Sequence, residues 1–126
     1  ALYAALLQTE NTARRAQNDT GSDQISVVYE STDPLLWRKE GDFAIIEGVI
    51  TSTRSFKRVG LLNFGDDWKR DFTAALKKSI KSDFEQKFGT LDTLSGRRVR
   101  VRGFLDLYNG PSMRIDHAAQ MEFLTE

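Results

Sequence analysis

The sequence predicts a mainly β fold: a five-stranded barrel with a helix between its third and fourth strands, and a further helix at the N-terminus. Residues 97–108 alternate strictly between polar and apolar side chains, which predicts a strand with one buried face. Residues 82–94 repeat an apolar residue every three or four positions, which predicts a helix packed on one side. Around them, residues 43–123 read as three extended segments, this helix and two more extended segments. That order is typical of the five-stranded OB barrel.

An apolar stripe predicts the N-terminal helix over residues 1–18. Its members, spaced by three or four residues, are Leu2, Leu6, Thr9, Ala13 and Ala16. The polar run at 18–23 ends the helix. Because a helix of this length is marginal alone, we expect it to pack on another surface. The expected division of the chain is a helical arm at 1–20, a connecting segment at 21–42 and an OB-fold domain at 43–126.

The connecting segment is expected to hold a short strand and a helical turn. Residues 25–29 (Ile-Ser-Val-Val-Tyr) have the composition of a strand. Asp33 can cap a turn that begins with Pro34, and Gly41 can end it. The apolar residues of this turn are expected to plug the barrel or its base; they are Leu35, Leu36 and Trp37.

Three strands are predicted before the main helix, at residues 43–56, 59–64 and 72–76. The first is long, and its inward phase switches near Gly48. This switch predicts the bulge or sharp bend that a small barrel needs in order to close. The charged loop at 54–58 joins the first strand to the second, and a turn at 65–67 leads toward the third.

The helix at 82–94 and two further strands complete the predicted barrel. Ser82 can cap this helix in a capping box with Glu85. The fourth strand covers 97–108, and Asn109-Gly110 is a strong hairpin signal. The fifth strand covers 113–117, and after a bend residues 121–124 close the chain.

The composition excludes several kinds of site. The 126 residues include no cysteine, which excludes thiol catalysis, disulfides and cysteine-based zinc sites. Eighteen basic residues balance eighteen acidic ones, so any attraction to nucleic acid must come from local patches. No apolar run is long enough to span a membrane, and the apolar start lacks the basic flank of a signal peptide. Because the chain starts with Ala1, we expect an upstream piece to have been removed.

Four stretches resemble one protein family. They are LNFGDDW at 62–68, DFTAAL at 71–76, GRRVRVRGFL at 96–105 and YNGPSMRIDHAAQMEFL at 108–124. Together they are similar to the OB-fold module of bacterial proteins related to staphylococcal nuclease (the thermonuclease family), in which the module follows the nuclease domain. The stretch at 6–16 resembles the last helix of such a nuclease domain. The resemblance implies a secreted or periplasmic bacterial protein with an upstream nuclease domain.

The nuclease motifs themselves are missing from the chain. No Asp-Gly-Asp-Thr type turn or Asp-x-Pro-Glu type segment matches, so no catalytic residue is carried over. Asp66 and Asp67 could bind a divalent cation with help from Asp71, but two adjacent acids are too few for a site. We therefore expect no enzyme activity, no catalytic residue, no metal site and no cofactor.

An OB barrel usually binds ligands on the face of its second and third strands, between its first and last hairpin loops. There the sequence mixes aromatic rings with cations, a combination suited to single-stranded nucleic acid because bases stack on rings and cations meet phosphates. The predicted nucleic-acid-binding residues are Arg54, Phe56, Lys57, Arg58, Trp68, Lys69, Arg70, Tyr108 and Asn109. The alternative is that Phe56 and Trp68 cap the barrel ends and that the cations are merely solvated.

Two other features have structural interpretations. A ridge of arginines on the fourth strand, Arg98, Arg100 and Arg102, is expected to pair with acidic residues of a neighbouring strand. His117, the one histidine, is expected to hydrogen-bond backbone at the final bend rather than to act in catalysis.

The sequence thus favours a non-catalytic binding module for single-stranded DNA or RNA in a nuclease-like protein. The alternatives are a protein-interaction or dimerisation module and, with less support, a nuclease that hydrolyses phosphodiesters. The ligand stays open among DNA, RNA, sugar and protein, and the oligomeric state stays open as well.

Overall fold

The computed structural model describes residues 27–57, 59–67 and 69–124. The arm expected at 1–20 lies outside the described residues, as do Arg58 and Trp68. The strands are β1 (Val28–Glu30), β2 (Phe43–Val49), β3 (Ser52–Ser55), β4 (Val59–Asn63), β5 (Thr73–Lys77), β6 (Arg98–Leu107), β7 (Pro111–Ile115) and β8 (Met121–Phe123). The helix α2 covers Lys78–Phe88, and three 3-10 turns cover Pro34–Arg38 (η1), Leu91–Leu94 (η2) and Ala118–Gln120 (η3).

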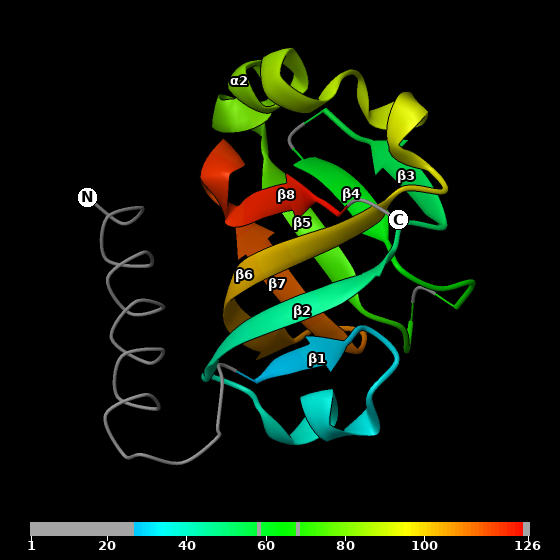
Figure 1. Ribbon diagram of the computed structural model, residues 1–126, viewed down its shortest axis with the longest axis vertical. Coiled ribbons are helices and arrows are strands. Elements are labelled where there is room, and N and C mark those ends of the chain that lie inside the picture. Colours follow the sequence, from blue (N-terminus) through cyan, green and yellow to red (C-terminus); the bar gives the residue numbers. More distant parts are fainter. Residues whose placement is uncertain (1–26, 58, 68, 125–126) are drawn as a thin grey trace.

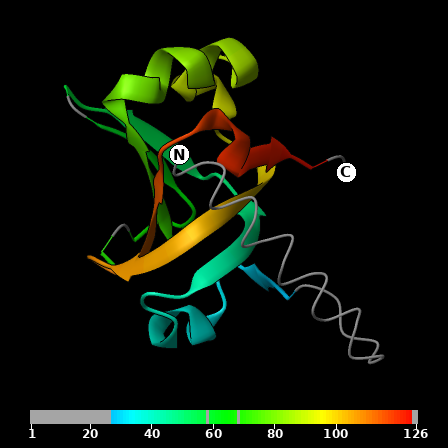
Figure 2. The same cartoon turned by 90° about the vertical axis from the view of Figure 1, so that its left-hand side faces the viewer.

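The described part of the chain is mainly β, with one mixed, unclosed sheet and one α-helix. The order of the strands is β1-β2-β6-β7-β5-β4-β3, and β8 pairs with β6. The β1–β2 and β5–β7 pairs are parallel, and the other pairs are antiparallel. Strands β2 and β6 cross over β4, β5 and β7, while α2 and η1 lie at opposite ends of the molecule (Figure 1). The view turned by 90° also shows α2 and η1 at opposite ends of the molecule (Figure 2).

Strands β2 and β3 are successive pieces of the long strand expected at 43–56. Only Ile50 and Thr51 separate them. The Ile50 amide donates to the carbonyl of Arg97 (3.0 Å), and the Thr51 amide donates to the carbonyl of Asn63 (2.8 Å). The chain therefore changes partner from β6 to β4 within two residues. The sequence predicted the bend near Gly48; this glycine instead allows a close approach, because an added Cβ would lie 2.2 Å from Ser31 Oγ.

The helix differs from the prediction at both of its ends. It starts at Lys78, directly after β5, and not at Ser82. The expected capping box is wrong: Lys77 is the N-cap, with no side-chain hydrogen bond, and the Glu85 carboxylate accepts from the amide of Leu91 (3.0 Å). Gly89, with a φ of 95°, ends the helix, and the remaining apolar positions fall in η2.

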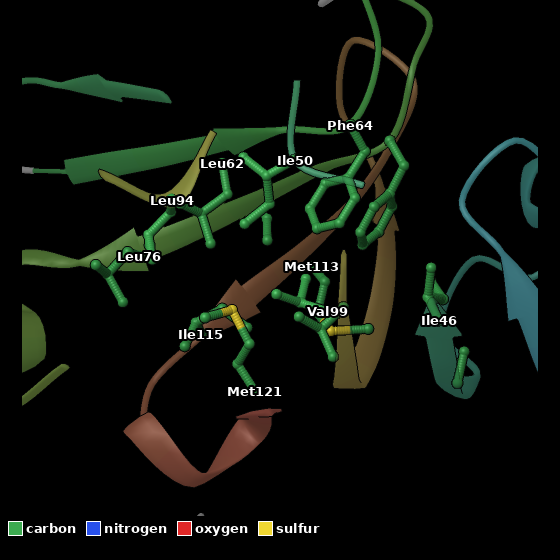
Figure 3. Packing of buried hydrophobic residues seen from close by; sticks show 14 of the residues in the cluster. Ile46, Ile50, Leu62, Phe64, Leu76, Leu94, Val99, Met113, Ile115 and Met121 are labelled. Atoms are coloured by element: carbon green, nitrogen blue, oxygen red, sulfur yellow. The ribbon is translucent and has the colours of Figure 1, made fainter. Parts of the chain in front are cut away.

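The core contains inward side chains from β2 and β6, from the strands β4, β5 and β7 that they cross over, and Phe84 of α2. Side chains from several strands point toward one another across this core (Figure 3). Val99, Val101 and Leu105 of β6 are buried, as the alternation predicted. In η1 only Leu36 is buried in this core, whereas Leu35 and Trp37 are about half exposed. Asp33 caps η1 as predicted, accepting from the amide of Leu35 (2.9 Å).

Among the described helices, none is both long and apolar enough to cross a membrane.

Candidate nucleic-acid interface

Two rows of side chains cross the outer face of β3, β4, β5 and β7. Because successive strand residues point to opposite faces, the neighbours of the buried residues Leu62, Ala74 and Met113 point outward. In one row, strand partners run in the order Arg54, Leu61, Ala75 and Arg114. This row has a cation at each end and an apolar middle.

The second row is polar and partly locked by hydrogen bonds. Its strand partners run in the order Ser52, Asn63, Thr73 and Ser112. Asn63 is 6% exposed. Its Nδ2 donates to Ser52 Oγ (3.3 Å), and its Oδ1 accepts from Thr73 Oγ1 (3.3 Å). These contacts fix the orientation of a polar group at the base of the face.

A pocket of about 270 Å³ opens on this face. Its lining residues are Arg54, Phe56, Leu61, Asn63, Thr73, Ala75, Tyr108, Asn109 and Ser112. Phe56 and Tyr108 are 48% and 78% exposed, and the Arg54 guanidinium lies 5.4 Å from the centre of the Phe56 ring. We call this site the aromatic pocket. It combines two accessible aromatic residues, one cation, and a floor that is apolar at Leu61 and Ala75 and polar at Asn63, Thr73 and Ser112.

The hairpin between β6 and β7 brings Tyr108 and Asn109 to the pocket. Asn109 and Gly110 both have positive φ, 51° and 88°, the backbone for which the Asn-Gly pair is suited. A Cβ on Gly110 would lie 2.5 Å from the carbonyl oxygen of Arg70. The hairpin thus packs directly against the turn before β5, and only glycine permits that contact.

The turn before β5 uses its carboxylates to hold its own backbone. Asp71 Oδ2 accepts from the amide of Asp67 (2.9 Å), and Asp67 Oδ1 accepts from the amide of Lys69 (3.1 Å). A Cβ on Gly65 would overlap the Asp71 side chain, at 2.2 Å from Oδ2. Within the described residues no group of three His, Cys, Asp or Glu side chains could hold a metal ion. Lys69 and Arg70 are exposed on this turn.

The structure brings four of the nine predicted residues together around the aromatic pocket: Arg54, Phe56, Tyr108 and Asn109. Lys57 instead lines a neighbouring hollow with Lys77, Lys78 and Ser79. Arg70 meets the pocket hairpin through its backbone. Arg58 and Trp68 lie outside the described residues. That these nine residues bind nucleic acid stays a prediction.

The sequence reasoning missed the floor of the pocket. The missed residues are Leu61, Asn63, Thr73, Ala75 and Ser112, with Arg114 beside them in the row. The alternation of β4, β5 and β7 could have found them, because each lies next to a buried residue.

The arginine ridge of β6 pairs with glutamates, as the sequence predicted. Arg98 contacts Glu30 at 2.5 Å and Glu47 at 3.4 Å, and Arg100 pairs with Glu47. Arg102 contacts Glu122 at 2.6 Å. The hydrogen bond with Glu30 raises the pKa of Arg98 above its ordinary value. The charge of the ridge is therefore largely neutralised by neighbouring strands.

His117 has a structural role at the final bend. Its Nδ1 accepts from the amide of Ala119 (3.1 Å), which forms the capping box of η3 with Gln120. Gln120 is 1% exposed. Its amide group accepts from the backbone of Asp116 and His117 and donates to the carbonyls of Arg102 and Arg114. The predicted structural interpretation of His117 agrees with these contacts.

Comparisons with known proteins find the fold in several solved structures. The OBody AM3L09 bound to hen egg-white lysozyme is 14% identical, with a TM-score of 0.52 over 71% of this chain and 87% of that one. An aspartyl-tRNA synthetase from Entamoeba histolytica is 9% identical, with a TM-score of 0.55 over 77% of this chain and 21% of that one. The asparaginyl-tRNA synthetase of the same organism, in complex with asparaginyl-adenylate, is 15% identical, with a TM-score of 0.50 over 79% of this chain and 24% of that one.

No protein-family model and no curated protein sequence matches this chain. The chain matches less than a quarter of the length of either synthetase. At 9–15% identity these likenesses concern the fold alone. They support the OB fold that the order of the elements predicts.

Proposed function

We propose that this chain is a non-catalytic OB-fold module that binds single-stranded nucleic acid through the aromatic pocket. The observation that carries the proposal is the pocket itself, in which the exposed residues Phe56 and Tyr108 lie beside Arg54 and a floor of mixed polarity. Bases stack on such rings whatever their sequence, and cations meet the backbone phosphates. A volume of about 270 Å³ is below the range of roughly 300–1,000 Å³ usual for drug-sized ligands. It suits one planar base rather than a larger compound.

The proposed barrel follows from the order of the strands. Strands β2 and β3 together act as the first barrel strand, and β4, β5, β6 and β7 follow as the second to fifth. In this scheme α2 lies between the third strand and the fourth. The aromatic pocket then lies on the face where OB barrels usually bind, between the first and last hairpin loops.

The fold likeness to two synthetases supports this proposal. The names of the aspartyl- and asparaginyl-tRNA synthetases say that those proteins act on tRNA, in keeping with a nucleic-acid ligand here.

Because the chain has no net charge, binding relies on local cations and is weak, in the micromolar range or above, and sensitive to salt.

We further propose that the module has no catalytic activity of its own. Asp67 and Asp71 are occupied with backbone amides of their turn, which supports this proposal. The setting in a nuclease-like, secreted or periplasmic bacterial protein is also a proposal, and it relies on the sequence resemblance. Cleavage of a single-stranded substrate by the purified chain with calcium, abolished by Asp67→Ala, would contradict the non-catalytic assignment.

The direct test is a fluorescence titration of a labelled 12-nucleotide oligothymidine at 50 and 200 mM salt. We expect saturable binding at low salt that weakens several-fold at high salt. Arg100→Ala is the control, because Arg100 already pairs with Glu47 and Glu122, and it should change the affinity by less than twofold. An absence of binding at low salt would refute the nucleic-acid proposal.

The second candidate function is binding of a protein partner, which one comparison favours. The OBody with the shared fold is bound to lysozyme, a protein. The same titration separates the two functions, since a protein-binding module has no reason to bind the oligonucleotide. In that case Phe56 and Tyr108 would be contact residues for a protein, as aromatic side chains often are.

A further inference from the structure

Four lysines gather beside the aromatic pocket, and the described lining of the hollow that three of them share contains no acid. Glu85 lines a second hollow with Lys78 and Lys81. Lys57, Lys77 and Lys78 line a shallow hollow of about 620 Å³ together with Ser79. The Nζ of Lys81 donates to Ser55 Oγ at 2.7 Å, which holds a fourth ammonium at the end of β3. We call Lys57, Lys77, Lys78 and Lys81 the lysine patch. Elsewhere on the molecule, the arginines of β6 pair with glutamates, so this patch is a different kind of surface.

Two lysines of the patch, Lys77 and Lys78, lie where a positive charge is unfavourable in the unliganded protein. Lys77 and Lys78 are the N-cap and the first residue of α2, whose first turn contains no acid. The start of a helix carries partial positive charge, which favours acids and opposes lysines. The lysines also repel one another. An anion in the hollow would offset both the repulsion among the lysines and their unfavourable interaction with the helix dipole. Binding of an anion therefore accounts for the position of these lysines, whereas packing does not.

The patch continues the face of the aromatic pocket. Thr73, Ala75 and Lys77 alternate along β5 with the buried Ala74 and Leu76, so all three point outward. Two residues of a strand span about 7 Å, which puts Lys77 one step beyond the pocket floor. Lys57 directly follows Phe56 of the pocket in the chain. The β3–β4 hairpin and α2 lie at the same end of the molecule (Figure 1).

We propose that the lysine patch binds backbone phosphates of the single strand whose base occupies the aromatic pocket. The strand then runs from the pocket along β5 toward the start of α2. This inference rests on the proposed function and adds the path of the ligand. It also assigns a role in binding to Lys77, Lys78 and Lys81, which lie outside the interface predicted from the sequence.

The first test compares two lengths of oligothymidine. A dinucleotide can fill the pocket, whereas a 12-mer also reaches the patch. We expect Lys77→Ala/Lys78→Ala to weaken 12-mer binding roughly tenfold at 50 mM salt and to reduce its salt slope by about 1 to 2. Dinucleotide binding should stay within twofold. The matched control is Lys87→Ala, at the other end of the same helix, which should leave both ligands unaffected.

Equal 12-mer affinities and salt slopes for the double variant and Lys87→Ala would overturn the proposal that the lysine patch binds phosphates. The proposed role of the aromatic pocket would still stand. That outcome differs from failure of the proposed function, in which the wild-type chain binds neither ligand.

The second test is Lys78→Glu, which separates binding from folding. An acid in the first turn interacts favourably with the helix dipole, so the melting temperature should rise by roughly 1 to 4 °C. The 12-mer affinity should fall by more than it does in Lys78→Ala. A raised melting temperature with unchanged affinity would show that the lysines are ordinary surface charges, and the inference would be wrong.

Discussion

Phe56 and Phe104 are exposed to nearly the same extent, 48% and 46%, in different surroundings. Phe56 lines the aromatic pocket, whereas Phe104 packs edge-on against Phe43 at a centroid distance of 5.5 Å. Stacking of one base is worth about 1–3 kcal/mol. Phe56→Ala should therefore weaken oligothymidine binding roughly tenfold, as measured by fluorescence titration.

Phe104→Ala provides the matched control for that substitution. It removes a ring of the same size and exposure away from the pocket, so the affinity should stay within twofold. Equal losses in the two variants would mean that Phe56 acts through stability and not through contact with a base.

Glu47 is the best-buried acid of the arginine ridge. Its side chain is 17% exposed, against 45% for Glu122, and it accepts from both Arg98 and Arg100. Glu47→Gln removes one carboxylate partner from each of these two arginines and should lower the free energy of unfolding by roughly 1–2 kcal/mol in urea at neutral pH. Glu122→Gln should cost less because water screens it more. A larger loss from Glu122→Gln would contradict this ranking.

The fourth strand is the element that the sequence predicted best. Strict alternation fixed the buried face of β6, and the regular outward arginines indicated acidic partners on neighbouring strands. Local pattern was sufficient there because side chains alternate between the two faces of a strand.

The start of α2 was predicted poorly, for a physical reason. Capping preferences favour Ser82 over Lys77, yet the chain passes from β5 into the helix without a loop, and Ile80 packs against the core. Tertiary packing therefore outweighed the local signal. The pocket floor was missed because its residues come from three strands, β4, β5 and β7, and no short window of sequence contains that arrangement.

The β6–β7 hairpin can be tested through two glycines with the same φ of 88°. Gly96 has nothing within 4 Å of an added Cβ, whereas Gly110 would meet the Arg70 carbonyl oxygen at 2.5 Å. Gly96→Ala should cost about 1–2 kcal/mol from backbone strain alone. Gly110→Ala should cost at least about 1 kcal/mol more and should also weaken oligonucleotide binding, because Tyr108 and Asn109 shift. Urea unfolding and the titration measure the two effects, and equal costs would argue against the contact with Arg70.

Across the whole molecule, a net charge of zero conceals two different basic surfaces. The arginines of β6 are paired with glutamates on β1, β2 and β8. The lysines that line the hollow at the start of α2 have no acid beside them in that lining. The local potential thus differs between the two faces although the total is neutral.

The most direct test of the binding face is NMR mapping with ¹⁵N-labelled protein and unlabelled 12-nucleotide oligothymidine at low salt. The proposed function predicts the largest amide shifts at Phe56, in β4 and β5, and in the hairpin at 108–110. The β2–β6 layer with its arginine ridge should shift little. Shifts centred on Arg98, Arg100 and Arg102, or none at ligand concentrations up to the millimolar range, would contradict it.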